Sequence, residues 1–167
     1  MAQKKDTDLL FRQYSALKNH EFSEITGDPE DHKCAFGLVN NVRYNYDLFT
    51  EEQKQSLKIL LQRIPRTHSI VSPAGKFKVH YNAAGIEAPA YEPGLTPDQN
   101  ALLVAEALDS SWNFEVNYLG YPPPRDNGGG GDSLYDVYIT NTGGGGSGFY
   151  GYTEFSLSEK SKTLIIS

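Results

Sequence analysis

The spacing of apolar and polar positions predicts helices in the first third of the chain. Leu10, Tyr14 and Leu17 lie three or four positions apart, so they share one face of an N-terminal helix. Glycine, proline and acidic side chains at 26–31 then break that helix and indicate a solvated linker. Further on, apolar residues alternate with polar ones over 42–46, a pattern that predicts a short strand.

A second helix is predicted over residues 51–64. Thr50 and Gln53 have the spacing of a capping box, in which each side chain satisfies the backbone amide of the other residue. The positions that follow form one apolar stripe at helical offsets: Leu57, Leu60, Leu61 and Ile64. Pro65 cannot continue the helix, so the element ends there.

The clearest signal in the chain predicts a long helix over residues 97–119. Thr96 and Gln99 repeat the capping box, and Pro97 occupies the first helical position, where proline is favoured. Gly120 and the three prolines after Tyr121 end the helix. Its core-facing side is formed by residues that recur every three or four positions: Ala105, Leu108, Trp112, Val116 and Leu119.

Strand patterns lie on both sides of this helix. Residues 77–81 alternate apolar with polar side chains, and three runs rich in β-branched and aromatic residues follow at 135–140, 149–155 and 163–166. The element order is therefore helix-rich, then β–α–β–β–β. This order predicts an α+β fold with a helical N-terminal segment and a mixed, twisted sheet backed by one long helix, or else an α/β arrangement of the same elements.

Charge and composition exclude several kinds of partner. The chain has 167 residues with 15 basic and 21 acidic side chains, and its net charge of −6 argues against binding to nucleic-acid phosphates. No apolar run approaches the ~20 residues of a membrane span. A single cysteine excludes an internal disulfide framework, and no nucleophile–base pair or cofactor loop is visible. We therefore expect neither a nucleic-acid partner nor a membrane span.

Aspartates around a glycine-rich turn are the first candidates for chemistry. Ten of the 16 glycines fall between Gly128 and Gly151, and Asp126, Asp132 and Asp136 lie in or beside this stretch. Glycine lets a loop fold tightly enough to bring carboxylates together, and Ca²⁺ prefers such oxygen ligands. The spacing matches no EF-hand loop, so a solvated loop whose aspartates cap turns is the alternative.

Six short motifs follow residue 71 in a specific order and spacing. They are SPAGKFKVHY at 72–81, VAEAL at 104–108 with Trp112, LGYPPP at 119–124, GGD at 130–132, YDVY at 135–138 and YGYT at 150–153. In this order they resemble the N-terminal lobe of a family of secreted bacterial zinc metallopeptidases with a zincin-like fold. A weaker similarity, at 32–34 and in the predicted helix 51–64, extends to the pro-segment of that family.

The resemblance implies a pro-segment over 1–64, an exposed, cleavable connector over 65–75 and the upper lobe of a zincin-like domain over 76–167. In the family, a strand like 164–167 leads to a helix with His-Glu-x-x-His, whose imidazoles hold Zn²⁺ and whose glutamate is the general base. This sequence has no such motif. We therefore expect a non-catalytic portion of a secreted or periplasmic zinc peptidase, whose partners are its own catalytic lobe and a peptide or protein substrate.

Cys34 is the second candidate, because it follows a basic residue in the segment that resembles a pro-segment. There the resemblance implies a latch, in which the thiolate replaces the attacking water on a catalytic zinc. The alternatives are a small buried apolar residue or an incidental free thiol.

A different class of function stays open, a self-sufficient secreted binding or inhibitor module that has no catalytic half. The two hypotheses share the same sheet and helix. They differ in whether the reading frame continues past Ser167 into a His-Glu-x-x-His helix.

Overall fold

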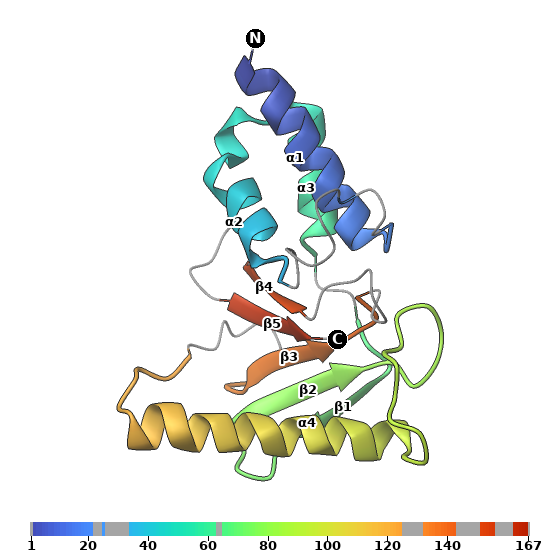
Figure 1. Cartoon of the computed structure of the whole chain (residues 1–167), viewed down its shortest axis with the longest axis vertical. Coiled ribbons are helices and arrows are strands. Elements are labelled where there is room, and N and C mark those ends of the chain that lie inside the picture. Colours follow the sequence, from blue (N-terminus) through green and yellow to red (C-terminus); the bar gives the residue numbers. More distant parts are fainter. Residues whose placement is uncertain are drawn as a thin grey trace.

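A computed structural model of the chain describes residues 2–21, 25, 34–62, 65–124, 132–142, 151–155 and 162–166. These residues form two units that meet at one edge of a β-sheet (Figure 1). The described residues from 2 to 62 make a helical unit and those from 65 to 166 make a sheet unit. The α+β fold class, with a mixed sheet and one long backing helix, is confirmed.

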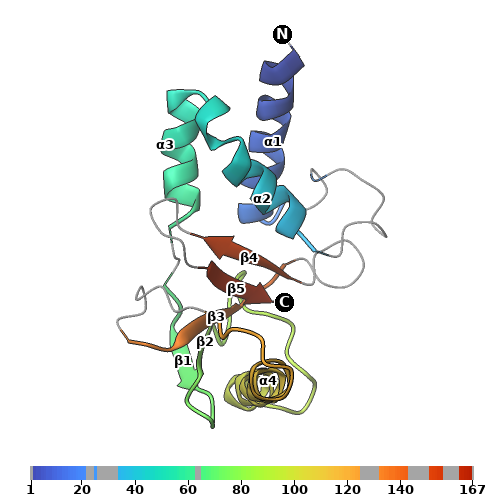
Figure 2. The same cartoon turned by 90° about the vertical axis from the view of Figure 1, so that its left-hand side faces the viewer.

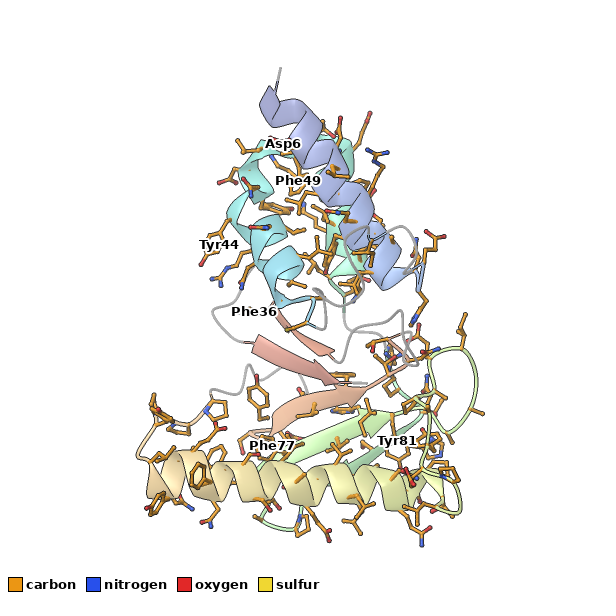
Figure 3. All side chains as sticks on the ribbon, in the orientation of Figure 1. Asp6, Phe36, Tyr44, Phe49, Phe77 and Tyr81 are labelled. Carbon is orange, nitrogen blue, oxygen red and sulfur yellow. The ribbon has the colours of Figure 1, made fainter. Side chains whose placement is uncertain are left out.

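The helical unit contains α1 (Ala2–Lys18), α2 (Phe36–Tyr44), a 3₁₀ turn (Tyr46–Leu48) and α3 (Glu51–Leu60). Their inward faces meet in one apolar cluster, which Figure 3 shows between the helices. Its buried members from this unit are Tyr14, Leu17, Ala35, Val39, Val42, Phe49 and Leu57. The predicted N-terminal helix is therefore present, with Tyr14 and Leu17 on its buried face.

The start of α3 is the capping box that the sequence predicts. The Thr50 hydroxyl accepts from the Gln53 amide at 3.2 Å, and Gln53 Oε1 accepts from the Thr50 amide at 3.0 Å. Gln53 Nε2 also donates to Asp8 on α1 at 2.8 Å, so the cap joins two helices. The helix ends at Leu60, earlier than predicted, and residues 63 and 64 lie outside the described residues.

The short strand predicted at 42–46 is wrong. Val39 and Val42 lie three positions apart on α2, and both are buried in the same cluster as Phe49. Tyr44, which supplied part of the alternation, is exposed and points away from the cluster (Figure 3). Burial of the valines on a helical face therefore decides this segment, and the two-residue alternation was accidental.

The described strands form one five-stranded sheet in the order β1-β2-β3-β5-β4. β3 is parallel to both β2 and β5, whereas β1 and β4 are antiparallel to their neighbours. β4 lies at the end of the sheet nearest the helical unit, and β1 at the opposite end (Figures 1 and 2). The bounds are β1 (His68–Val71), β2 (Phe77–Tyr81), β3 (Tyr135–Ile139), β4 (Gly151–Phe155) and β5 (Lys162–Ile166).

β1 lies inside the interval 65–75, where the sequence predicted a connector and no strand. Most of its residues are exposed, so no burial pattern marks them. The turn to β2 is fixed by Ser72, whose hydroxyl accepts from the amides of Lys76 and Phe77 at 3.2 and 3.1 Å. The same hydroxyl donates to Asp109 on the backing helix at 2.7 Å, which fastens this hairpin to the rest of the unit.

α4 (Pro97–Trp112) backs the sheet and starts with the predicted capping box. It continues as a π-helix (Asn113–Tyr118), and Gly120 ends the helix with a φ of 75°, which glycine adopts without strain. Trp112, predicted to be a core residue, packs edge to face on Phe77 with the ring centroids 5.8 Å apart, but Leu119, predicted on the same core-facing side, is 46% exposed. The buried cluster beneath the helix contains Phe77, Val79, Tyr81, Ala101, Ala105, Val137 and Ile139.

β3 connects the two buried clusters. Val137 and Ile139 belong to the cluster beneath α4, whereas Tyr138 between them belongs to the cluster of the helical unit. Successive side chains of a strand point to opposite faces of the sheet, so one strand serves both cores. The helical unit and α4 therefore pack on opposite faces of β3.

Candidate functional site

The outer edge of β4 is where α2 meets the sheet. β4 pairs with β5 along one side, and on its other side Cys34 forms a parallel bridge with Gly151. The Ala35 amide donates to the Gly151 carbonyl at 3.2 Å, and Ala35 is 1% exposed. α2 starts at the next residue and contacts β4 (Figure 1). The first residue of this edge strand is thus already paired with the chain's own backbone.

Cys34, the predicted latch residue, lies at this edge. Its thiol is exposed and forms no disulfide. The interpretation as a small buried apolar residue is therefore wrong, while the latch and the incidental thiol remain as hypotheses. Gly151, which the structure brings beside Cys34, belongs to one of the motifs that resemble the zincin-like lobe.

The described aspartates of the predicted calcium site each have a partner on β2. Asp126 lies outside the described residues. Asp132 Oδ2 lies 2.9 Å from Lys78 Nζ. Asp136 Oδ1 lies 2.8 Å from His80 Nε2, and Asp136 is buried within β3. Asp132 and Asp136 therefore both contact β2, but each pairs with a different side chain there.

The ion pair with Lys78 shifts the pKa of Asp132. The hydrogen bond from Lys78 holds the pKa of Asp132 below its ordinary value, and the same bond raises the pKa of Lys78. An ammonium beside a carboxylate opposes the approach of a second cation. In the described segments, no group of three or more His, Cys, Asp or Glu side chains could hold a metal ion. The described residues therefore present no assembled metal-binding group, and the calcium site predicted with Asp126 stays a prediction.

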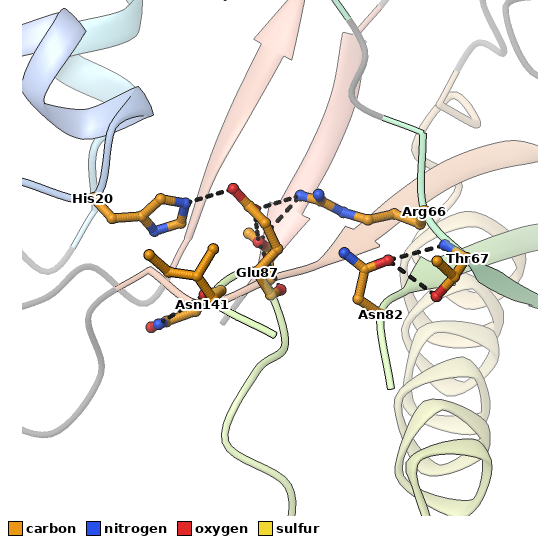
Figure 4. Close-up of polar contacts among 8 residues, drawn as sticks. His20, Arg66, Thr67, Asn82, Glu87 and Asn141 are labelled. Carbon is orange, nitrogen blue, oxygen red and sulfur yellow. Dashed lines mark hydrogen bonds and ion pairs between the residues drawn. The ribbon is translucent and has the colours of Figure 1, made fainter. Parts of the chain in front are cut away.

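A polar cluster that the sequence did not predict links the end of α1 to the sheet unit (Figure 4). His20 Nε2 lies 2.8 Å from Glu87 Oε1. Arg66 Nη2 lies 3.1 Å from Glu87 Oε2, and the hydroxyl of Thr140, just after β3, donates to the same oxygen at 2.9 Å. The four residues come from four distant segments, so no local motif or spacing could have indicated them.

Glu87 is the centre of this cluster. Burial of its carboxylate raises the pKa, but the hydrogen bonds from His20 and Thr140 and the charge of Arg66 outweigh burial, so the pKa of Glu87 lies below its ordinary value. The Arg66 side chain is 5% exposed, and its Nε and Nη1 have no hydrogen-bond partner among the described residues. A buried guanidinium in this state depends on Glu87 for charge compensation.

No protein-family model, curated protein or solved structure matches this chain. None of the helices among the described residues is long and apolar enough to cross a membrane. The zincin-like resemblance, and the zinc, calcium and secretion that it implies, therefore stay predictions.

Proposed function

We propose that this chain is the pro-segment and the upper, non-catalytic lobe of a secreted zinc-dependent metallopeptidase that acts on peptides or proteins. The observation that carries the proposal is the position of the helical unit on the outer edge of β4, at Cys34 and Ala35. Two features of the fold support it. The sheet ends in an antiparallel edge strand, and one long helix backs the sheet.

An edge strand offers a row of backbone N–H and C=O groups to another extended chain. In the zincin-like peptidases that the sequence resembles, the edge strand of the upper lobe lies near the cleft and pairs with substrate in this way. Our proposal assigns this role to β4, because β4 is an edge strand that lies directly before β5 in the chain and beside it in the sheet. Ala35 already uses the Gly151 carbonyl. A helical unit in this position would keep a peptidase latent.

The catalytic chemistry of the proposed enzyme belongs to a lobe with His-Glu-x-x-His and its zinc, and this sequence lacks that motif. Because the sequence lacks this motif, we assign this chain no catalytic step. Its proposed role is to form one wall of the substrate cleft and to close that cleft in the precursor. Calcium stays a prediction for Asp126, Asp132 and Asp136.

The same edge also supports a second function, a secreted binding or inhibitor module without catalytic activity. An edge strand binds an extended peptide by its backbone whether or not a catalytic lobe is present. In that case the contact of Ala35 with Gly151 would regulate peptide binding in place of hydrolysis.

The full product of the reading frame distinguishes the two functions. A recognition sequence for a specific protease is placed between Gln62 and Pro65, and the release of labelled fragments from casein is measured before and after cutting. We expect no hydrolysis before the cut, hydrolysis after it, and loss of hydrolysis when a chelator removes the metal. A cut product without hydrolysis and without His-Glu-x-x-His would contradict the peptidase and support the binding module.

The same product tests the latch. If the Cys34 thiolate occupies the catalytic zinc, Cys34→Ser makes the uncut protein active. If the uncut variant stays latent, the thiol is incidental. The backbone hydrogen bond between Ala35 and Gly151 is then the next contact to test.

A further inference from the structure

We propose that His20, Arg66, Glu87 and Thr140 form a clasp that holds the helical unit over the outer edge of β4, so that breaking the His20–Glu87 contact uncovers this edge for an extended peptide. The inference rests on the proposed function for the meaning of the uncovered edge. The clasp itself follows from contacts between the two units, which Figure 4 shows.

His20 occupies a backbone position that favours glycine. Its φ of 62° lies in the left-handed region, and among the described residues it is the one non-glycine residue with a positive φ. The Glu21 amide donates to the Ala16 carbonyl at 2.9 Å, the pattern of a helix end whose left-handed residue is usually glycine. A locally unfavourable residue indicates a role for its side chain elsewhere. Here the imidazole reaches Glu87 of the sheet unit.

The other half of the clasp is fixed within the sheet unit. The Asn141 amide donates to the Glu87 carbonyl at 3.4 Å, and Asn141 Nδ2 donates to the Ile86 carbonyl at 3.2 Å, which ties this loop to the end of β3. Thr140 and Arg66 both hold Glu87 Oε2, whereas Oε1 faces His20. The carboxylate is therefore positioned by its own unit and presents one oxygen to the helical unit.

Among the described residues, the clasp is one of several attachments between the units, in addition to the contact of α2 with β4. Others are the Ala35–Gly151 hydrogen bond and the ring of Tyr138 in the helical cluster. A single neutral backbone bond at the start of a strand resists opening weakly, whereas hydrogen bonds to a charged carboxylate are roughly twice as strong. We therefore expect loss of the clasp to make the β4 edge open more often.

Amide hydrogen exchange in the intact chain measures this opening. The buried Ala35 amide is the reporter, because it exchanges when its bond to Gly151 breaks. His20→Gly suits the left-handed backbone, and His20→Asn tolerates it with a shorter side chain, so both remove the imidazole and preserve the end of α1. We expect exchange at Ala35 to be at least about tenfold faster in both variants, the effect of losing a hydrogen bond to a charged group.

Two amides and one variant serve as controls. The Glu21 amide reports whether the end of α1 is intact, and the Val79 amide reports the core of the sheet unit; both are expected to keep their wild-type rates. His68→Asn is the matched variant, since His68 stacks on Tyr81 within the sheet unit at 5.4 Å. It is expected to leave exchange at Ala35 unchanged.

An unchanged rate at Ala35 in both His20 variants would overturn the clasp. Equally faster exchange at Ala35 and Val79 would also overturn it, because the exchange would then come from unfolding of the whole chain and not from separation of the two units. Neither result depends on hydrolysis. If the exchange experiment contradicts the clasp, the proposed peptidase function is unaffected. If the full product has no peptidase activity, the clasp proposal is unaffected.

Discussion

The two units of this chain depend on each other unequally. The cluster of the sheet unit draws its buried residues from β2, α4 and β3, all within that unit. The cluster of the helical unit includes Tyr138, which belongs to β3. Among the described residues, the buried cluster of the sheet unit therefore contains no side chain from α1, α2 or α3, whereas the cluster of the helical unit contains one side chain from the sheet unit. Such an arrangement suits a segment that covers a stable lobe and can leave it.

Loss of the shared tyrosine is expected to have the largest effect. Tyr138→Ala removes a buried ring, a change that costs about 3–5 kcal/mol for aromatic side chains in cores. We expect the helical unit to lose amide protection before β2 does, as measured by native-state hydrogen exchange. Tyr138→Phe keeps the ring and serves as the control. Simultaneous loss of protection in both units would contradict the unequal dependence.

The two capping boxes give matched probes of the separate units. Thr50→Ala and Thr96→Ala each remove one cap and are each expected to cost about 1 kcal/mol. The single tryptophan, Trp112, lies in the sheet unit, so its fluorescence follows that unit during denaturant unfolding. We expect Thr96→Ala to lower the fluorescence midpoint and Thr50→Ala to lower mainly the midpoint from circular dichroism. Equal shifts by both probes would mean that the units unfold together.

Acid is expected to weaken the attachment between the two units by protonating Glu87. The pKa of this carboxylate is lowered in the fold, so its ionised form adds stability above its ordinary pKa of 4.5. That contribution is lost as pH falls through the lower folded value. Wild type should therefore exceed Glu87→Gln in stability most above about pH 5, and the difference should shrink below about pH 4. A difference independent of pH, in denaturant melts at each pH, would show that the charge of Glu87 is immaterial.

Calcium is expected to have the smallest effect. Lys78 and His80 already pair with Asp132 and Asp136, so the described aspartates offer Ca²⁺ no free cluster. Millimolar Ca²⁺ or a chelator should move the melting temperature by no more than about 1 °C, which is about a quarter to a half of a kcal/mol for a chain of this size. A rise of several degrees with Ca²⁺ would instead establish the calcium site predicted from Asp126, Asp132 and Asp136.

The elements that the sequence predicts well are those decided by local chemistry. Both capping boxes, the long helix and the terminating Gly120 follow from residues within a few positions of one another. α2 was predicted wrongly because its helical form depends on burying Val39 and Val42 with Phe49 from another segment. β1 was missed because its exposed residues gain their structure from pairing with β2.

The contacts between the two units could not be predicted from the sequence for the same physical reason. His20 and Glu87 are 67 positions apart, and Arg66 and Thr140 are 74 apart. No periodicity or spacing links such residues, and each alone is an ordinary polar side chain. The one local sign is His20 at the end of α1, where glycine would be expected, and it becomes visible once the backbone is known. Cys34 was noticed from its sequence context, but its place beside Gly151 comes from the fold.

A reversible disulfide across the β4 edge tests most directly the central claim that the helical unit closes this edge. Gly151→Cys, made in the full product of the reading frame with the cleavable site after Gln62, places a thiol opposite Cys34 across their parallel bridge. Hydrolysis of casein by the cut protein is compared before and after a phosphine reduces the disulfide, with Cys34→Ser in the same background as the control. We predict that the oxidised protein stays inactive and that reduction releases its activity. Equal activity in the oxidised and reduced proteins would show that the helical unit does not close the site.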